Sequence, residues 1–146
     1  MNKGIKNYIN NCLSGIFYSK KNNCEYVFRS IYEFAYFYQL EKNNDVLKYI
    51  VEPFKIPYRN PYDKKTHYYY PDVIVYYKSG LKIIYEIKPF EKIKNIVVQK
   101  KANATKKYIK KNNLADKYLF ITEKDIFKSN NDYLTIKKIL KSQIRN

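Results

Sequence analysis

The chain has few residues of the kinds that build disulfide frameworks and zinc sites. Its 146 residues include two cysteines, Cys12 and Cys24, and one histidine, His67. Two cysteines are too few for the several bridges that hold small secreted domains together, and a structural zinc ion takes four Cys or His ligands. The sequence therefore disfavours both classes, and we interpret the cysteines as free thiols.

Long apolar runs are also missing. No run approaches the roughly 18 apolar residues that span a bilayer. The first residues, Met1–Asn7, lack the continuous apolar core of a secretory signal. We therefore expect an intracellular protein that is neither secreted nor embedded in a membrane.

Acidic side chains are scarce relative to basic ones. The chain has 13 Asp and Glu residues against 29 Lys and Arg residues, a formal net charge of +16. Part of the lysine content follows AT-rich codon usage, since Asn, Ile, Tyr and Phe are abundant too. The shortage of acids nevertheless favours a polyanionic partner. An anionic membrane surface is the competing interpretation, but no terminal segment is clearly a basic amphipathic helix.

The sequence predicts one domain that follows a polar N-terminal segment. Residues 1–23 are rich in Asn and Lys, and we interpret them as a polar N-terminal arm. The remaining 24–146 are enough for one domain with a single core. Ser30 and Glu33 form a capping box, which predicts a helix up to about Glu41.

The later elements follow from hydrophobic periodicity and turn residues. They are a bent strand over 46–58, strands over 70–77 and 81–88, a helix over 93–111, a strand over 117–122 and a helix over 132–143. The order is therefore helix, three strands, helix, strand, helix.

Two of these strands carry the residues with the clearest chemistry. Asp72 lies in the first, and Glu86 and Lys88 share one face of the second because strand side chains alternate. Two carboxylates can bind Mg²⁺ through oxygen, and a nearby ammonium can orient water and balance the charge that builds during phosphate hydrolysis. The plainer alternative is a surface hairpin with a charged, solvated face.

The register of this hairpin decides between the two interpretations. A two-residue loop, Ser79-Gly80, would put Asp72 and Glu86 on opposite faces of the sheet. A three-residue loop, residues 78–80, sets Asp72 directly opposite Glu86 and requires a left-handed Gly80. We predict the three-residue loop, or else a bulge near Pro71 that restores the same register.

The motif itself resembles that of a known enzyme superfamily. Pro71-Asp72, thirteen further residues and then Glu86-Ile87-Lys88 resemble the PD-(D/E)XK nuclease motif. Additional segments resemble tailed-phage head-completion nucleases and the N-terminal endonuclease domain of the TnsA transposition subunit; they cover residues 28–33, 51–58, 65–72 and 85–89. The resemblance spans about residues 28 to 125. It implies an α/β (α+β) fold with a restriction-endonuclease-like core, ordered α-β-β-β-α-β, and a central mixed sheet flanked by helices.

The resemblance also implies roles for individual residues. Asp72, Glu86 and the backbone carbonyl of Ile87 would bind Mg²⁺ or Mn²⁺, and Lys88 would orient water or stabilise charge. Glu33 would be an additional catalytic acid near the metal. The alternative for Glu33 is the purely structural role of a capping residue.

Several basic residues are candidates for DNA contacts. Arg29 either binds phosphate or pairs with a nearby glutamate. The lysines of the helix over 93–111 form either a solvated face or a track for a DNA backbone; those chosen as candidates are Lys100, Lys101 and Lys107. Gln99 and Lys101 also lie where many such nucleases carry an accessory residue. We interpret His67 and Tyr68–Tyr70 as structural strand residues.

Together these features predict a metal-dependent DNA endonuclease, of the phage head-completion or DNA-processing type. Its partners would be DNA and, for a phage protein, head or portal proteins in the host cytoplasm or the virion. The alternatives are a virion neck or connector protein that keeps the fold, and a non-catalytic basic DNA-binding module. The presence of Asp72, Glu86 and Lys88 together favours an enzyme.

Overall fold

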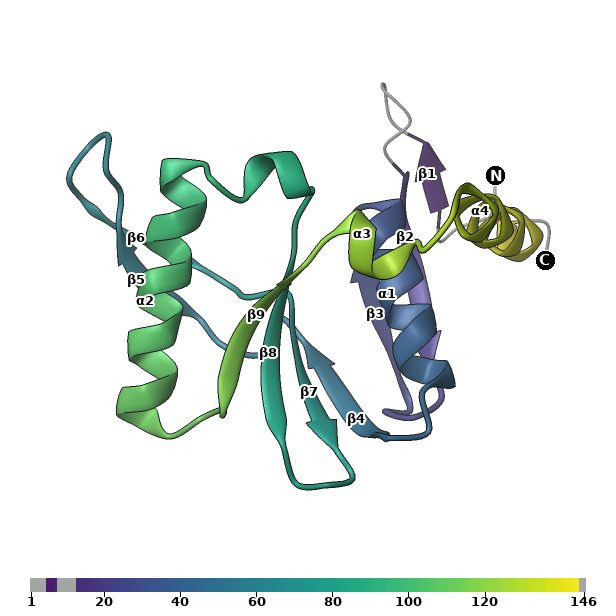
Figure 1. Cartoon of the computed structure of the whole chain (residues 1–146), viewed down its shortest axis with the longest axis horizontal. Helices are drawn as coiled ribbons and strands as arrows, with labels where there is room; N and C mark the ends of the chain where they lie inside the picture. The colour runs from purple at the N-terminus through teal and green to yellow at the C-terminus, as the bar shows by residue number, and fades with distance from the viewer. Residues whose placement is uncertain (1–4, 8–12, 145–146) are drawn as a thin grey trace. The chain divides into compact units, whose positions relative to one another are not determined.

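The computed structural model describes residues 5–7 and 13–144. The chain divides into two compact units (Figure 1). The central unit is Asn44–Thr122, and the terminal unit is Met1–Asn43 together with Glu123–Asn146. Within the described ranges, no helix is long and apolar enough to cross a bilayer.

A four-stranded mixed sheet forms the framework of the central unit (Figure 1). In order across the sheet, its strands are β4 (Val46–Val51), β7 (Val73–Tyr77), β8 (Lys82–Ile87) and β9 (Lys117–Ile121). The first two pairings are antiparallel, and β8 pairs with β9 in parallel. Val73, Ile74 and Val75 are all fully buried, as expected for a strand covered on both faces.

Helix α2 (Ile96–Asn112) packs on this sheet through an apolar stripe. Ala102 and Ile109 of the helix share one buried cluster with three sheet residues, Ile74, Ile84 and Tyr118. Burying each large side chain of such a cluster stabilises the fold by about 1.5–3 kcal/mol. All lysines of α2 except Lys101 are exposed.

The start of α2 differs slightly from the prediction. Residues Phe90–Lys92 form a separate 3₁₀ turn, and the helix begins at Ile96 rather than at residue 93. The reason is Asn95, whose side-chain oxygen accepts hydrogen bonds from the N–H groups of Val97 and Val98 at 2.9 and 3.4 Å.

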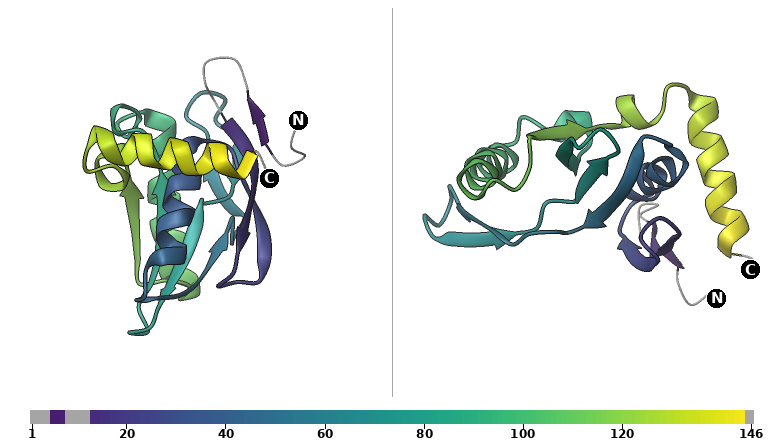
Figure 2. Two further views of the ribbon diagram at one scale, coloured as in Figure 1. Left: turned by 90° about the vertical axis from the view of Figure 1, so that its right-hand side faces the viewer. Right: turned by 90° about the horizontal axis from the view of Figure 1, so that it is seen from below.

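The segment predicted as one bent strand over 46–58 is two strands in two sheets. β4 ends at Val51, and Glu52 then adopts a φ of 51°. Pro53 has no N–H to continue the ladder. β5 (Ile56–Arg59) pairs instead with β6 (Thr66–Tyr69). The β5–β6 hairpin runs alongside α2 (Figure 2), with which it shares a cluster built on Ile56, Tyr58 and Tyr69.

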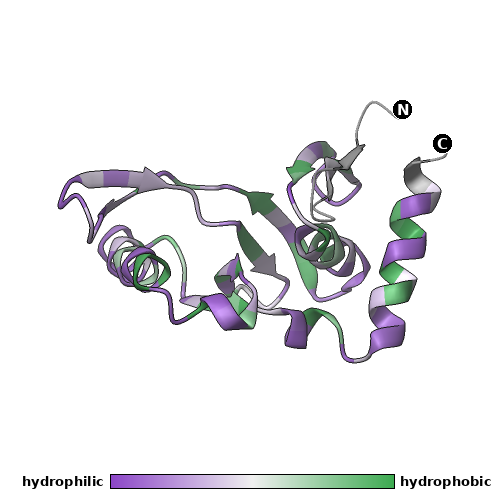
Figure 3. Ribbon diagram, turned by 90° about the horizontal axis from the view of Figure 1, so that it is seen from above, coloured by the Kyte–Doolittle hydropathy of each residue, from purple (hydrophilic) through white to green (hydrophobic). Residues whose placement is uncertain are grey.

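The terminal unit combines a three-stranded antiparallel sheet with helices. Its elements are β1 (Ile5–Asn7), β2 (Leu13–Ser19), β3 (Cys24–Phe28), α1 (Ile31–Lys42), α3 (Glu123–Ile126) and α4 (Asn130–Ile144). In α4, hydrophobic and hydrophilic residues alternate along the turns (Figure 3), and Ile136 and Leu140 are buried. Cys24 is a free thiol, as predicted, whereas Cys12 lies outside the described residues.

Part of the segment assigned to a polar arm, residues 1–23, is a strand. Phe17 and Ser19 of β2 are buried while Ile16 and Tyr18 are exposed, which is the alternation of a half-buried strand. The Ser19 hydroxyl donates to Glu41 of α1, and Phe17 packs edge-on against Phe34 at 5.8 Å between ring centroids. The frequent Asn and Lys residues around this strand hid the alternation. Residues 1–4 and 8–12 lie outside the described part.

Helix α1 begins as the capping box predicts. The Ser30 side chain accepts a hydrogen bond from the N–H of Glu33 at 3.1 Å. In chain order, α1, β4, β7, β8, α2 and β9 then reproduce the predicted α-β-β-β-α-β sequence, with the β5–β6 hairpin inserted after β4. The predicted mixed α+β class and the central mixed sheet are confirmed.

Candidate active site

The β7–β8 hairpin has the register that the site requires. Its pairs run from Tyr76 opposite Lys82 to Val73 opposite Tyr85, which sets Asp72 opposite Glu86. At the other end, Tyr77 donates its N–H to the carbonyl oxygen of Leu81 at 2.9 Å, so that three residues remain in the loop.

Gly80 closes this loop with a positive φ of 94°. Its N–H donates to the Tyr77 carbonyl oxygen at 2.9 Å. The predicted three-residue loop and its left-handed glycine are therefore confirmed. As a result, both acids lie on the same face of the sheet.

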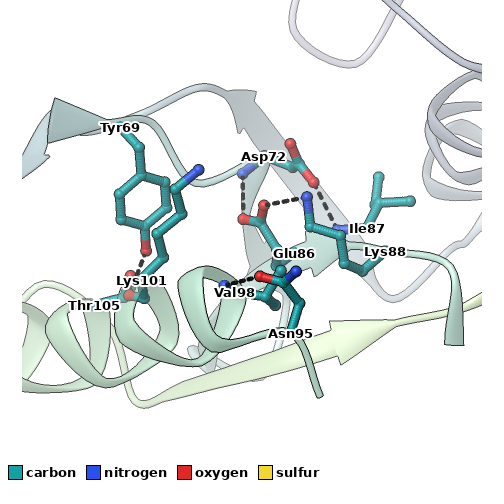
Figure 4. Close-up of polar contacts among 9 residues, drawn as sticks. All are labelled: Tyr69, Asp72, Glu86, Ile87, Lys88, Asn95, Val98, Lys101 and Thr105. Atoms are coloured by element: carbon teal, nitrogen blue, oxygen red, sulfur yellow. Dashed lines mark hydrogen bonds and ion pairs between the residues drawn. The ribbon is translucent and has the colours of Figure 1, made fainter. Parts of the chain in front are cut away.

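Each of the two carboxylates is held by the backbone of the neighbouring strand (Figure 4). Asp72 Oδ2 accepts a hydrogen bond from the N–H of Ile87 at 2.6 Å, and Glu86 Oε2 accepts one from the N–H of Asp72 at 3.3 Å. These reciprocal bonds fix the two acids next to each other where β7 begins and β8 ends.

Lys88 follows directly after β8 and lies beside Glu86. Its Nζ is 3.9 Å from Glu86 Oε1, and 30% of the Lys88 side chain is exposed against 9% of that of Glu86. The backbone N–H of Lys88 donates to the Ile121 carbonyl oxygen at 2.9 Å, which extends the parallel pairing with β9. The lysine therefore has a fixed backbone and a side chain that can reach solvent or a substrate.

The donor set suits a hard, oxygen-binding cation. In the part of the chain that the structure describes, no three His, Cys, Asp or Glu side chains are grouped as a metal site. The chain offers two adjacent carboxylates and the nearby backbone instead. Mg²⁺ is commonly bound in this way, because it keeps several waters and takes one or two carboxylates together with substrate phosphate oxygens.

Two buried tyrosines line the region around Glu86. Burial raises the pKa of both phenols, Tyr69 and Tyr118, above the usual value, and the negative charge of Glu86 raises it further. The Tyr69 hydroxyl donates to the carbonyl oxygen of Lys101 at 2.8 Å. Both phenols are therefore neutral and add no charge beside Glu86.

Lys101 belongs to this region rather than to the exposed face of α2. Its Nζ lies 5.5 and 5.4 Å from the ring centroids of Tyr58 and Tyr69. In Figure 4 its side chain runs along the Tyr69 ring from α2 toward the strand end that carries Asp72. Cation–π contact thus holds a second ammonium group near the carboxylates.

Comparison with protein families now supplies the classification. The model of the TnsA-like endonuclease N-terminal family matches residues 43–123, more than half of the chain. The chain belongs to this family. A comparison with curated proteins found no match. The family establishes a nuclease-type domain with a restriction-endonuclease-like fold, as the sequence predicted.

The family match covers Asp72, Glu86, Lys88 and Lys101, but not Glu33 or Arg29. The latter two belong to the terminal unit, whereas the TnsA-like site lies in the central unit. Glu33 Oε2 accepts a hydrogen bond from the N–H of Arg29 at 2.6 Å, which gives Glu33 a capping contact. The catalytic role of Glu33 and the phosphate contact of Arg29 stay predictions.

The remaining candidate residues of the TnsA-like domain differ in their exposure and contacts. Lys100 and Lys107 are exposed on α2. Gln99 donates through Nε2 to the carbonyl oxygen of Ile93 at 2.7 Å. His67 pairs with Asp63 at 2.6 Å beside the loop of the β5–β6 hairpin.

Tyr69 and Tyr118 are the site residues that sequence reasoning missed. The tyrosines around position 69 were interpreted as sheet residues, and nothing in the motif points to Tyr118. The charge of Glu86 influences both phenols because the fold brings distant parts of the chain together. A local pattern carries no signal for such contacts.

Proposed function

We propose that the central unit is a metal-dependent endonuclease that hydrolyses phosphodiester bonds of DNA. One observation carries the proposal: the register of β7 and β8 places Asp72 opposite Glu86, with the Lys88 ammonium 3.9 Å from Glu86. Membership of the TnsA-like endonuclease family supports the nuclease activity. The net charge of +16 supports DNA as the substrate.

Asp72 and Glu86 would hold the metal ion, Mg²⁺ or Mn²⁺, together with the backbone carbonyl of Ile87. When bound, such an ion polarises the scissile phosphate and lowers the pKa of a water molecule. The protein contributes rigidity, because the hydrogen bonds from Ile87 to Asp72 and from Asp72 to Glu86 prevent the carboxylates from turning away.

Lys88 supplies the positive charge that hydrolysis needs. Its ammonium donates to the attacking water or to a phosphate oxygen and balances the negative charge of the transition state. Attack by water forms a new P–O bond as the bond to the 3′ oxygen breaks, and a proton passes to the departing oxygen. The reaction needs no covalent intermediate with the enzyme.

Lys101 would assist at a phosphate oxygen. The rings of Tyr58 and Tyr69 hold its Nζ, and it differs in this from the freely exposed lysines of α2. Lys100, Lys107 and Arg29 would contact the DNA backbone. The role that the resemblance implies for Glu33, that of an additional catalytic acid, stays a prediction.

The biological setting is a prediction from sequence resemblance alone. It comprises the head-completion role, head or portal partners, and a location in the host cytoplasm or the virion. A structural neck or connector protein and a non-catalytic basic DNA-binding module are the alternatives. Both differ from an endonuclease in leaving DNA uncut.

The decisive experiment is a cleavage assay with the full chain on supercoiled, linear and branched DNA. We expect cleavage with Mg²⁺ or Mn²⁺, including conversion of supercoiled circles, and none with a chelator. Asp72→Asn and Glu86→Gln should abolish cleavage, and binding should be unchanged or slightly tighter because repulsion from phosphate falls. Glu91→Gln is the matched control, since Glu91 is exposed in the same unit. Wild-type protein that binds DNA but cuts no form of it would support the binding module instead.

A further inference from the structure

A basic groove lies between β5 and α2 of the central unit. It has a volume of about 460 Å³ and is lined by residues of both elements. Every charged side chain among the lining residues is basic: Arg59 from β5, and Lys100, Lys107 and Lys111 from α2. A single sign of charge on both walls of a groove concentrates positive potential there.

The three lysines form one straight row on α2. Lys107 and Lys111 follow Lys100 by seven and eleven residues, which are close to two and three whole turns of 3.6 residues. At 1.5 Å per residue the row is about 16 Å long. One strand of a duplex advances 3.4 Å per nucleotide along its axis while winding around it, so the straight row can follow the backbone over only a few phosphates.

The groove is continuous with the active-site region through two residues. Tyr58 lines the groove, and the Nζ of Lys101 lies over its ring at 5.5 Å. The same Nζ lies over Tyr69, whose phenol is influenced by the charges of Glu86 and Asp72. From this point the lysine row leads along α2 away from the two carboxylates.

The lining favours a duplex over a single strand. Binding of single strands relies on exposed aromatic rings on which bases stack. Tyr58 is buried, with Tyr69 packed edge-on at 5.7 Å. Tyr108, which also lines the groove, packs against the Ile56 cluster. The groove therefore presents charge for a backbone and no open ring for a base.

We propose that this groove binds the sugar-phosphate backbone of double-stranded DNA on one side of the scissile bond. The inference rests on the proposed endonuclease function and adds to it the form of the substrate. It requires the duplex to continue beyond the cleavage point in the direction of Lys111.

The test compares two pairs of lysines on the same helix. Lys107→Gln with Lys111→Gln removes two charges from the groove, and Lys106→Gln with Lys110→Gln removes two exposed charges that do not line it. Binding to a duplex is measured at several salt concentrations in the presence of a chelator, so that the result does not depend on cleavage. A Lys107→Arg with Lys111→Arg variant keeps the charge and checks for damage to the fold.

We expect the groove pair to lose about five-fold in affinity per lysine near 0.15 M salt, and the slope of log affinity against log salt to become shallower by about 2. The control pair should bind within about two-fold of wild type, and the arginine variant should bind as wild type. Equal losses for the two glutamine pairs, or a weakened arginine variant, would overturn the groove as the docking track. An equal loss on single-stranded DNA would overturn its preference for a duplex. Selective binding without any cleavage in Mg²⁺ would refute the nuclease proposal and leave the groove intact.

Discussion

The two hairpins of the central unit show how one type of element serves two purposes. In the β7–β8 hairpin, side chains on both faces are buried and the loop has three residues. In the β5–β6 hairpin, Tyr68 is 58% exposed, and the loop carries exposed charged residues. The pairing of the first hairpin fixes the positions of Asp72 and Glu86, whereas the second hairpin exposes side chains to solvent. A one-residue shift in the first hairpin would separate the two acids, whereas the exposed loop of the second can take up a change in length.

The largest expected effect comes from breaking the register of β7. Insertion of one alanine after Val75 moves Asp72 to the face opposite Glu86 and displaces three fully buried residues. We expect cleavage to be abolished and the free energy of unfolding to fall by about 3 kcal/mol or more. Urea denaturation and a cleavage assay measure the two effects.

The matched insertion is one alanine after Pro61, in the loop of the β5–β6 hairpin. That loop is an exposed turn, so the free energy of unfolding should change by less than about 1 kcal/mol and cleavage should persist. Equal damage from both insertions would contradict the contrast between the hairpins.

A smaller effect is expected for a substitution that slows cleavage without changing the fold. Lys88→Gln removes the ammonium beside Glu86, and we expect the rate of cleavage to fall about 10²–10³-fold, as for the loss of one charge-stabilising group in other enzymes. Lys82→Gln, at an exposed lysine that begins β8, should retain wild-type activity. Single-turnover kinetics with saturating protein separate this loss from weaker binding. A Lys88→Gln variant as fast as wild type would remove Lys88 from the mechanism.

The loops of the two hairpins should differ in which substitutions they tolerate at the residue with a positive φ. A Cβ on Gly80 meets no atom within 4 Å, so Gly80→Ala carries only backbone strain at its φ of 94°, about 1–2 kcal/mol. In the β5–β6 loop, Lys64 already adopts a φ of 61°. Lys64→Gly should therefore leave the free energy of unfolding unchanged or slightly higher. Thermal or urea unfolding of both variants tests the pair, and destabilisation by Lys64→Gly would contradict it.

The smallest effect concerns the buried phenol between β6 and α2. Tyr69→Phe loses the hydrogen bond to the Lys101 carbonyl oxygen, which keeps the Thr105 hydroxyl as a donor at 2.7 Å. We expect a loss of about 1 kcal/mol in the free energy of unfolding at neutral pH. Tyr68→Phe is the exposed control and should have no effect.

The pH dependence of the same variant has a definite sign. Burial raises the pKa of Tyr69 in the folded protein above its value in the unfolded chain, about 10. The associated stability is complete below pH 10 and decreases as pH rises beyond it, because only the unfolded chain releases the proton. Between pH 9 and about 11, wild type should lose more stability than Tyr69→Phe. Parallel decreases would contradict a neutral, buried phenol.

Local rules predicted much of the fold and the central part of the site. The relation between loop length and strand pairing, with glycine at position 80, was enough to place Asp72 opposite Glu86. The capping residues Ser30 and Glu33 located the start of α1. These features succeed because a few neighbouring residues determine them.

The rest depended on contacts between distant segments. Strand β2 was missed because polar neighbours hid the alternation of Phe17 and Ser19. The sequence places Lys101 both among the exposed lysines of α2 and at the position of an accessory residue, but it does not predict that Tyr58 and Tyr69 hold its side chain. That placement follows from the packing of the β5–β6 hairpin against the helix, which no periodicity in either segment contains.

The parallel pairing of β8 with β9 also sets the order in which the site can form. Lys88 is fixed by a hydrogen bond to Ile121, which comes 33 residues later and only after the whole of α2. While the chain is being synthesised, β8 therefore remains an unprotected edge until residue 121 has left the ribosome. Pairing across such a long connection is a slow step of folding. A growing chain thus contains all of its acidic and basic site residues well before their geometry is complete, because that geometry waits for β9.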